Sequence, residues 1–123
     1  LLHMKRILLV EDDKNIQRLL QQELHDDGYF ILAVSNGKEA LPYINGENGN
    51  KPDLIILDLR MPQMNGFETM GHIIKSRRDT PVIIHTAYSS YRNDVMALAA
   101  DAYVEKSHDL TKLKSTIRDL LGE

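Results

Sequence analysis

Five short apolar runs, separated by stretches with a helical period, limit the fold of this chain more than any other feature. The runs cover residues 7–10, 30–34, 54–57 and 82–84, and Tyr103 and Val104 form a weaker one. Nearly continuous apolar runs of this length are typical of strands that are buried on both faces of a sheet. Because the runs alternate strictly with helical stretches, the sequence predicts an α/β fold in which helices cover both faces of a parallel five-stranded sheet.

The stretches between the runs carry apolar residues three and four positions apart, which is the spacing of amphipathic helices. Gly28 is expected to end the first helix, and Asn36 with Glu39 resembles a capping box that opens the second. Pro42 lies inside the second helix, which should therefore be short or kinked. The five predicted apolar faces consist of Ile16, Leu19, Leu20 and Leu24; Ala40, Leu41 and Ile44; Phe67, Met70, Ile73 and Ile74; Val95, Leu98 and Ala99; and Leu110, Leu113, Ile117, Leu120 and Leu121.

Composition excludes several classes of protein. The chain has 123 residues, of which 42% are hydrophobic, and this fits one domain with a sizeable core. The net charge of -3 and the scattered basic residues argue against direct binding of nucleic acid by this domain. The absence of cysteine excludes disulfides and thiolate metal sites and fits a reducing compartment.

No segment of the sequence is typical of a membrane protein or a secreted protein. No apolar run approaches the ~18 residues of a membrane span, and no leader resembles a signal peptide. We therefore expect a cytoplasmic protein without membrane contact. Residues 1–3 precede Met4 and are interpreted as a remnant of an expression vector, so the domain is expected to span residues 4–123.

Polar side chains follow four of the predicted strands at the point where each strand ends. Asp58 closes the third run, and Glu11 and Asp12 directly follow the first. Thr86 ends the fourth strand and Lys106 follows the fifth. Because the carboxyl ends of parallel strands lie at one edge of the sheet, we expect these five side chains to share a single crevice.

The charges of this group predict a metal ion. Three crowded carboxylates repel one another by several kcal/mol per close pair at an effective dielectric constant of ~20, and Lys106 supplies only one positive charge. A hard divalent ion such as Mg2+ suits a site that offers only oxygen ligands. An ionised Asp58 beside that metal is a nucleophile for phosphorus, with Lys106 and Thr86 placed to hold the oxygens of the transferring group. The expected product is an aspartyl phosphate.

The same segments, taken in order, resemble a response-regulator receiver domain of two-component signalling, and the resemblance covers essentially the whole chain from Met4. It implies a flavodoxin-like (βα)5 fold, a doubly wound parallel five-stranded sheet of order 2-1-3-4-5. The segments that carry it are Ile7-Leu8-Leu9-Val10-Glu11-Asp12-Asp13; Pro52-Asp53-Leu54-Ile55-Ile56-Leu57-Asp58-Leu59-Arg60-Met61-Pro62 with Asn65-Gly66; Pro81-Val82-Ile83-Ile84-His85-Thr86-Ala87; and Asp101-Ala102-Tyr103-Val104-Glu105-Lys106.

The resemblance also implies roles for individual residues. Asp58 would accept a phosphoryl group from a phosphohistidine of a sensor histidine kinase or a histidine phosphotransfer protein. Asp12, Asp58 and the backbone carbonyl of Arg60 would ligate Mg2+, and Glu11 would act through water. Lys106 would contact the phosphoryl oxygens. The domain would thus be a phosphoacceptor that assists its own phosphorylation and dephosphorylation, rather than an enzyme acting on a separate substrate.

A conformational switch is implied as well. Thr86 would hydrogen-bond the phosphoryl group, and Tyr103 would rotate inward as Thr86 moves. That rotation would remodel the surface of the fourth helix, fifth strand and fifth helix, near Val95 and Leu113, where a downstream effector domain or protein, or a second copy in a homodimer, would bind.

Some alternatives stay open at this point. Three successive acids allow a second register for the metal pair, but Val10 matches the residue before the family's acidic pair, so Asp13 is interpreted as a helix N-cap. Ser107 stands where the family usually has a proline, so the bond after Lys106 is expected to be trans, or cis under strain.

Two other classes of protein compete with a signalling switch. One is a pseudo-receiver that serves only as a binding surface. The other is a Mg2+-dependent phosphatase of the haloacid-dehalogenase type, which would need a second acid at the position of Arg60. Within the leading interpretation, the side chains of Arg60 and Tyr88 are expected to line the entrance of the phosphate site and to tune the rate of dephosphorylation.

Overall fold

The five apolar runs form one parallel sheet in the computed structural model, which describes residues 4–49, 51–76 and 79–123. The sheet has the order β2-β1-β3-β4-β5, and all four strand pairs are parallel. The predicted fold class and strand order are confirmed. The vector remnant predicted for residues 1–3 lies outside the described residues. The strands are β1 (Arg6–Val10), β2 (Phe30–Val34), β3 (Leu54–Leu57), β4 (Val82–Thr86) and β5 (Ala102–Glu105).

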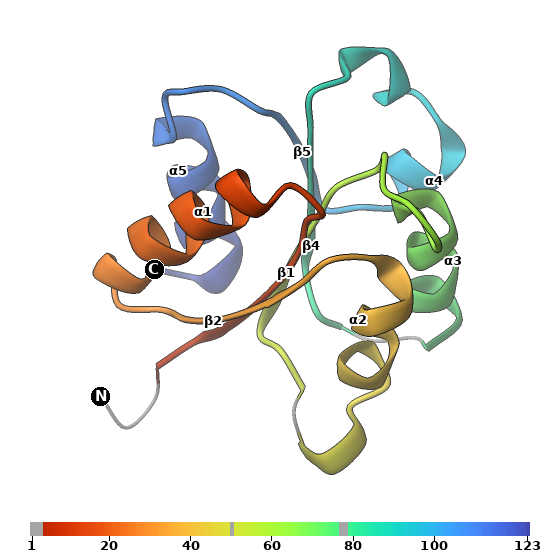
Figure 1. Ribbon diagram of the computed structural model, residues 1–123, viewed down its shortest axis with the longest axis horizontal. Helices are drawn as coiled ribbons and strands as arrows, with labels where there is room; N and C mark the ends of the chain where they lie inside the picture. Colours follow the sequence, from red (N-terminus) through yellow and green to blue (C-terminus); the bar gives the residue numbers. More distant parts are fainter. Residues whose placement is uncertain (1–3, 50, 77–78) are drawn as a thin grey trace.

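Helices cover both faces of this sheet, with α1 and α5 on one side and α2, α3 and α4 on the other (Figure 1). The alternation of side chains along a strand divides the interior into two cores. Ile7 and Leu9 of β1 pack with the helices α1 and α5, while Leu8 and Val10 pack with the opposite layer. The helices are α1 (Lys14–Asp26), α2 (Gly37–Ile44), α3 (Gly66–Ser76), α4 (Val95–Leu98) and α5 (Thr111–Leu121), and the 3-10 turns are η1 (Glu47–Gly49) and η2 (Ser89–Tyr91).

The predicted helix ends are largely confirmed. The Asp13 carboxylate accepts hydrogen bonds from the backbone N–H groups of Asn15 and Ile16 at 2.9 and 3.2 Å, so Asp13 caps α1. Gly28 follows the other end of α1 with a φ of 97°, a backbone conformation that favours glycine. The helix α2, which contains Pro42, has only eight residues, as expected.

Only one of the two hydrogen bonds of the predicted capping box is formed. The side chain of Asn36 accepts from the N–H of Glu39 at 2.9 Å. The carboxylate of Glu39, however, accepts from the N–H of Ser35 at 2.7 Å instead of returning to Asn36. The start of α2 is therefore tied to the carboxyl end of β2.

The fourth helix does not bury the apolar face predicted from Val95, Leu98 and Ala99. Val95 is 79% exposed and Leu98 is 65% exposed, and Ala97 is the α4 residue that reaches the core. The helix is a single turn of four residues that follows η2, so a pattern with a period of 3.6 residues has too little length to orient it. Leu19 in α1 and Ile74 in α3, also predicted to face the core, are exposed.

Candidate functional site

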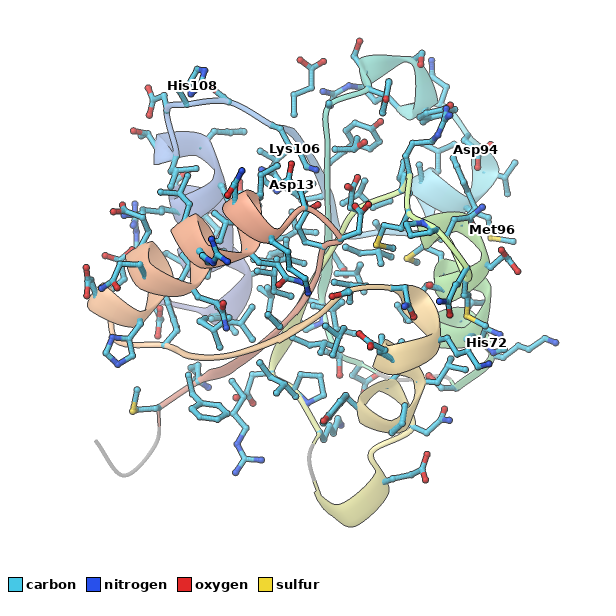
Figure 2. The ribbon with its side chains drawn as sticks, viewed as in Figure 1. Asp13, His72, Asp94, Met96, Lys106 and His108 are labelled. Atoms are coloured by element: carbon cyan, nitrogen blue, oxygen red, sulfur yellow. The ribbon has the colours of Figure 1, made fainter. Side chains whose placement is uncertain are left out.

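Backbone hydrogen bonds place the candidate residues at one edge of the sheet. The N–H of Asp58 donates to the carbonyl of Val10 at 3.0 Å, and that of Lys106 donates to the carbonyl of Thr86 at 2.8 Å. The N–H of Glu11 likewise donates to the carbonyl of β2 residue Val34 at 3.0 Å. The hydrogen-bond ladder thus extends one residue beyond β1, β3 and β5. Figure 2 labels Lys106 and Asp13 close together at this edge of the sheet.

Lys106 bridges two of the three acids. Its Nζ lies 2.7 Å from Oε1 of Glu11 and 2.8 Å from Oδ2 of Asp58. Both carboxylates are buried, and each has a second donor: the N–H of Leu59 donates to Oδ1 of Asp58 at 2.7 Å, and the N–H of Asp13 to Oε2 of Glu11 at 3.1 Å. Buried charges require such partners.

Lys106 and Glu11, one of the two acids that it bridges, have shifted pKa values. Burial raises the pKa of Glu11 to about 7, and this outweighs the opposing effect of its hydrogen bond from Lys106. Burial acts to lower the pKa of Lys106, but the hydrogen bonds to Asp58 and Glu11 outweigh it and raise that pKa. Lys106 therefore stays charged, while Glu11 exchanges its proton near neutral pH.

The acids offer a set of ligands that fits a hard divalent cation. One carboxylate oxygen each from Glu11, Asp12 and Asp58 lies within 4.8 Å of the others. Asp12 is partly exposed, so this side of the cluster is open to water, which Mg2+ retains in most protein sites. Asp13, the other acid of the run, points its carboxylate at the start of α1.

Glycine and glutamine residues that the sequence interpretation left without a role support the site. A Cβ at Gly66 would collide with the carbonyl oxygen of Asp58 and lie 2.6 Å from the Cα of Leu59, so only glycine lets α3 begin against the backbone of the site. The buried side-chain amide of Gln17 donates to the carbonyl of Glu11. A glycine at the start of a predicted helix was a visible signal for Gly66, whereas nothing in the pattern distinguished Gln17.

Thr86 and Tyr103 both contact Tyr88. Thr86 is fully buried at the end of β4, and its hydroxyl accepts from the N–H of Tyr88 at 3.4 Å. The half-buried Tyr103 donates its hydroxyl to the carbonyl of Tyr88. The guanidinium of Arg92 lies 4.7 Å from the centroid of the Tyr103 ring. The two predicted switch residues are thus linked through the backbone of one intermediate residue.

Arg60 reaches across the site to the segment after β4. The Arg60 side chain is exposed, and its guanidinium lies 5.3 Å from the centroid of the Tyr88 ring. Its Nη1 donates to the hydroxyl of Tyr91 at 2.6 Å. The sequence interpretation paired Arg60 with Tyr88 but missed Tyr91, because a contact over 31 residues leaves no local pattern.

Comparison with known proteins agrees with this geometry. A family model described as the response regulator receiver domain matches residues 7–118. The transcriptional regulatory protein PcoR of Escherichia coli is 36% identical over 120 residues, which cover 96% of this chain and 52% of PcoR. The response regulator ArlR of Staphylococcus saprophyticus is 37% identical, over 96% of this chain and 53% of ArlR. The chain thus spans about half the length of these relatives.

Solved structures with the same architecture include complexes. The response regulator TrrA of Thermotoga maritima, in complex with Mg2+ and BeF, superimposes with a TM-score of 0.88 and 45% identity, over 95% of this chain and 99% of that one. TrrA in complex with the histidine kinase ThkA gives a TM-score of 0.85, over 96% of this chain and 99% of that one. Among the described residues, no helix is both long and apolar enough to cross a membrane.

Proposed function

The chain belongs to the response regulator receiver domain family, and from this premise we propose that it is a phosphorylation-activated signalling switch whose phosphoacceptor is Asp58. The observation that carries the proposal is the position of Lys106. Its ammonium bridges Asp58 and Glu11, with Asp12 beside them. This arrangement supports a site in which Asp58 is the nucleophile, Lys106 is the cation for the transferring group and the acids are the metal ligands.

Mg2+ is the cofactor that these residues suit. Asp12, Asp58 and the backbone carbonyl of Arg60 would hold it, and Glu11 would contact it through water. When bound, the ion neutralises charge on the acids and on the transferring phosphoryl group. The relative TrrA binds Mg2+ together with BeF, and this supports the assignment.

The residues of the chain position the phosphoryl transfer. A carboxylate oxygen of Asp58 forms the new P–O bond while the P–N bond of the donor phosphohistidine breaks and its electron pair stays on the imidazole nitrogen. The N–H of Leu59 holds Oδ1 of Asp58, so the carboxylate is oriented before the reaction. Lys106 then transfers its hydrogen bond from Oδ2 to a phosphoryl oxygen, and the hydroxyl of Thr86 donates to another.

The response to phosphorylation would pass through Thr86 and Tyr103. Since both contact Tyr88, a movement of the Thr86 hydroxyl toward the phosphoryl group alters the support of the Tyr103 hydroxyl. Tyr103 turns inward and changes the surface of α4, β5 and α5, where Val95 and Leu98 already expose apolar side chains.

The partners follow from the same function. A sensor histidine kinase, or a histidine phosphotransfer protein, would supply the phosphoryl group in the cytoplasm, as the complex of TrrA with ThkA suggests. A downstream effector domain or protein, or a second copy of this chain, would bind the altered surface. Residues 4–123 would form the receiver domain, which itself does not bind DNA. The intact set of acids, Thr86 and Lys106 disfavours a pseudo-receiver, and Arg60 at the position of the second acid disfavours a phosphatase.

Intact mass spectrometry after incubation with Mg2+ and acetyl phosphate tests the proposal. We expect one added phosphoryl group that is stable to acid, labile to base and lost on chelation of the metal. Asp58→Asn should abolish it. Asp53→Asn is the matched control, because Asp53 precedes β3 at the opposite end of that strand and accepts from the N–H of Arg6. A folded wild-type protein that gains no phosphoryl group, or gains it in the Asp58→Asn variant, would refute the assignment.

A further inference from the structure

The segment between β4 and α4, residues 87–94, is held in place by a side chain from the neighbouring loop. Arg60 donates to the hydroxyl of Tyr91 at 2.6 Å and lies 5.3 Å from the centroid of the Tyr88 ring. Tyr91 is further fixed by Phe67 at the start of α3, whose ring meets it edge-on at 5.2 Å. One exposed cation thus contacts two residues of the segment, and neither contact is used in the phosphoryl transfer described above.

A second attachment holds the same segment from the other side. The hydroxyl of Tyr103 donates to the carbonyl of Tyr88, and the rings of Tyr88 and Tyr91 lie 5.8 Å apart. The two tyrosines therefore form one unit between Arg60 and β5. Release of either attachment loosens the unit without breaking the sheet, because η2 and its neighbours lie outside all strand pairs.

In the unmodified site, the carboxylate of Asp58 is buried and bonded to groups other than Arg60. Asp58 is only 5% exposed, and its two oxygens already accept from Leu59 and Lys106. A phosphoryl group on Asp58 changes this, because it brings three acceptor oxygens that lie farther out than the buried carboxylate and replaces its single negative charge by about -1.5 to -2. Arginine binds phosphate through charge-assisted, paired hydrogen bonds, which are stronger than a bond to a neutral phenol.

We propose that Arg60 is a latch that responds to the phosphorylation state of Asp58 through Tyr91. In the unmodified protein the guanidinium holds the segment 87–94 in the position seen in the structure, through its contacts with Tyr91 and Tyr88. In the phosphorylated protein it turns to the phosphoryl oxygens and leaves Tyr91 and Tyr88, so that the segment is free to rearrange. This inference rests on the proposed function of Asp58. It gives the phosphorylation site a second connection to the segment 87–94, which starts from the loop after β3, in addition to the connection through Thr86 and Tyr103.

Binding of Mg2+–BeF, whose charge and shape imitate a phosphoryl group, tests the latch by calorimetry. Tyr91→Phe keeps the ring against Phe67 but removes the hydroxyl that Arg60 contacts. Since the latch no longer has to open, this variant should bind Mg2+–BeF about two- to fivefold more tightly than the wild type. Tyr29→Phe is the matched control, because it also removes a tyrosine hydrogen bond, to Glu123 at the other end of the molecule, and should leave the affinity unchanged.

The double variant Arg60→Gln/Tyr91→Phe distinguishes an effect of the Arg60 latch from an effect of Tyr91 packing. Arg60→Gln removes both the latch and the contact to the phosphoryl analogue, so adding Tyr91→Phe to it should change the affinity no further. If Tyr91→Phe raises the affinity equally with and without Arg60, the effect comes from packing and the latch is refuted.

Amide hydrogen exchange reports the segment directly. The amides of Arg92 and Asp94 donate to the carbonyls of Ser89 and Tyr91 at 3.1 and 3.0 Å. They should exchange faster in Tyr91→Phe than in the wild type without ligand, and equally fast in both with Mg2+–BeF. Unchanged affinity and exchange in Tyr91→Phe, with normal Asp58-dependent binding by the wild type, would overturn the latch alone. Failure of the wild type to bind Mg2+–BeF would overturn the proposed function and the latch together.

Discussion

The buried His85 should make the protein less stable in mild acid. His85 lies in β4 opposite Val104 of β5 and is 4% exposed, and its Nδ1 has no hydrogen-bond partner within the described part of the chain. Burial lowers its pKa from 6.5 to about 4, and the nearby charge of Lys106 acts in the same direction. The folded protein therefore keeps this imidazole neutral.

The sign and size of the effect follow from proton linkage. In the unfolded chain His85 takes up a proton near pH 6.5, but in the folded protein it does so only near pH 4. Stability that is fully present above pH 6.5 is therefore lost as the pH falls toward 4. From these two values the loss amounts to about 2 kcal/mol between pH 7.5 and pH 5.

Urea unfolding of the wild type and of His85→Leu, at pH 7.5 and pH 5, isolates this contribution. Other groups titrate in both proteins, so the difference between the two free energies of unfolding reports His85 alone. That difference should move by about 2 kcal/mol in favour of His85→Leu on acidification. His108→Leu is the control, because His108 is exposed and lies outside the buried core. A difference that does not depend on pH would refute a buried neutral imidazole.

Three further predictions concern the site and its supports. Gly66→Ala should destabilise the protein by about 1–3 kcal/mol in urea unfolding, because the added methyl group must displace the backbone of Asp58; an unaffected protein would show that the close approach is wrong. Asp13→Ala should lower the free energy of unfolding by about 1 kcal/mol in the same assay, because the α1 cap is lost. The variant should still be phosphorylated by acetyl phosphate, and loss of Mg2+ binding would instead show that Asp13 is a metal ligand. Burial raises the pKa of Glu11 to about 7, so Mg2+ affinity measured by calorimetry should increase from pH 6 to pH 8 as the competing proton leaves, and a flat profile would contradict this.

The sequence predicted the sheet well because its strands are buried on both faces. Such strands appear as apolar runs, and their alternation with helices leaves few topologies. The same reasoning predicted the edge at which Glu11, Asp58 and Lys106 meet. It did not predict that the Lys106 ammonium bridges the two carboxylates, because that depends on side-chain rotamers and on the depth of burial.

The sequence pattern could not predict the orientation of short helices or the side-chain contacts between distant segments. The single turn of α4 has too few residues for its periodicity to identify a buried face, so the apolar face marked by Val95 and Leu98 is exposed instead of packed on the core. Tyr91 has no role that its neighbours in the sequence reveal, since its contacts come from Arg60 and Phe67 in other elements. Both failures concern the segment after β4, where few backbone hydrogen bonds restrict the chain.

The charges of the site explain why its switch would depend on that loosely restricted segment. Three clustered acids exceed the single charge of Lys106. Burial raises the pKa of Glu11 to about 7, and the nearby charge of Asp58 acts in the same direction, so this carboxyl can hold a proton near neutral pH. A divalent cation would replace that proton and bring the cluster close to neutrality. Phosphorylation of Asp58 would then replace one negative charge by nearly two. The additional charge requires a further cation, and Arg60 is an exposed one in the adjoining loop, where its present contacts are a neutral phenol and an aromatic ring. Weak contacts at an exposed position are readily exchanged for a charged partner, so the segment 87–94, which Arg60 holds through such contacts, can respond to a single added phosphoryl group.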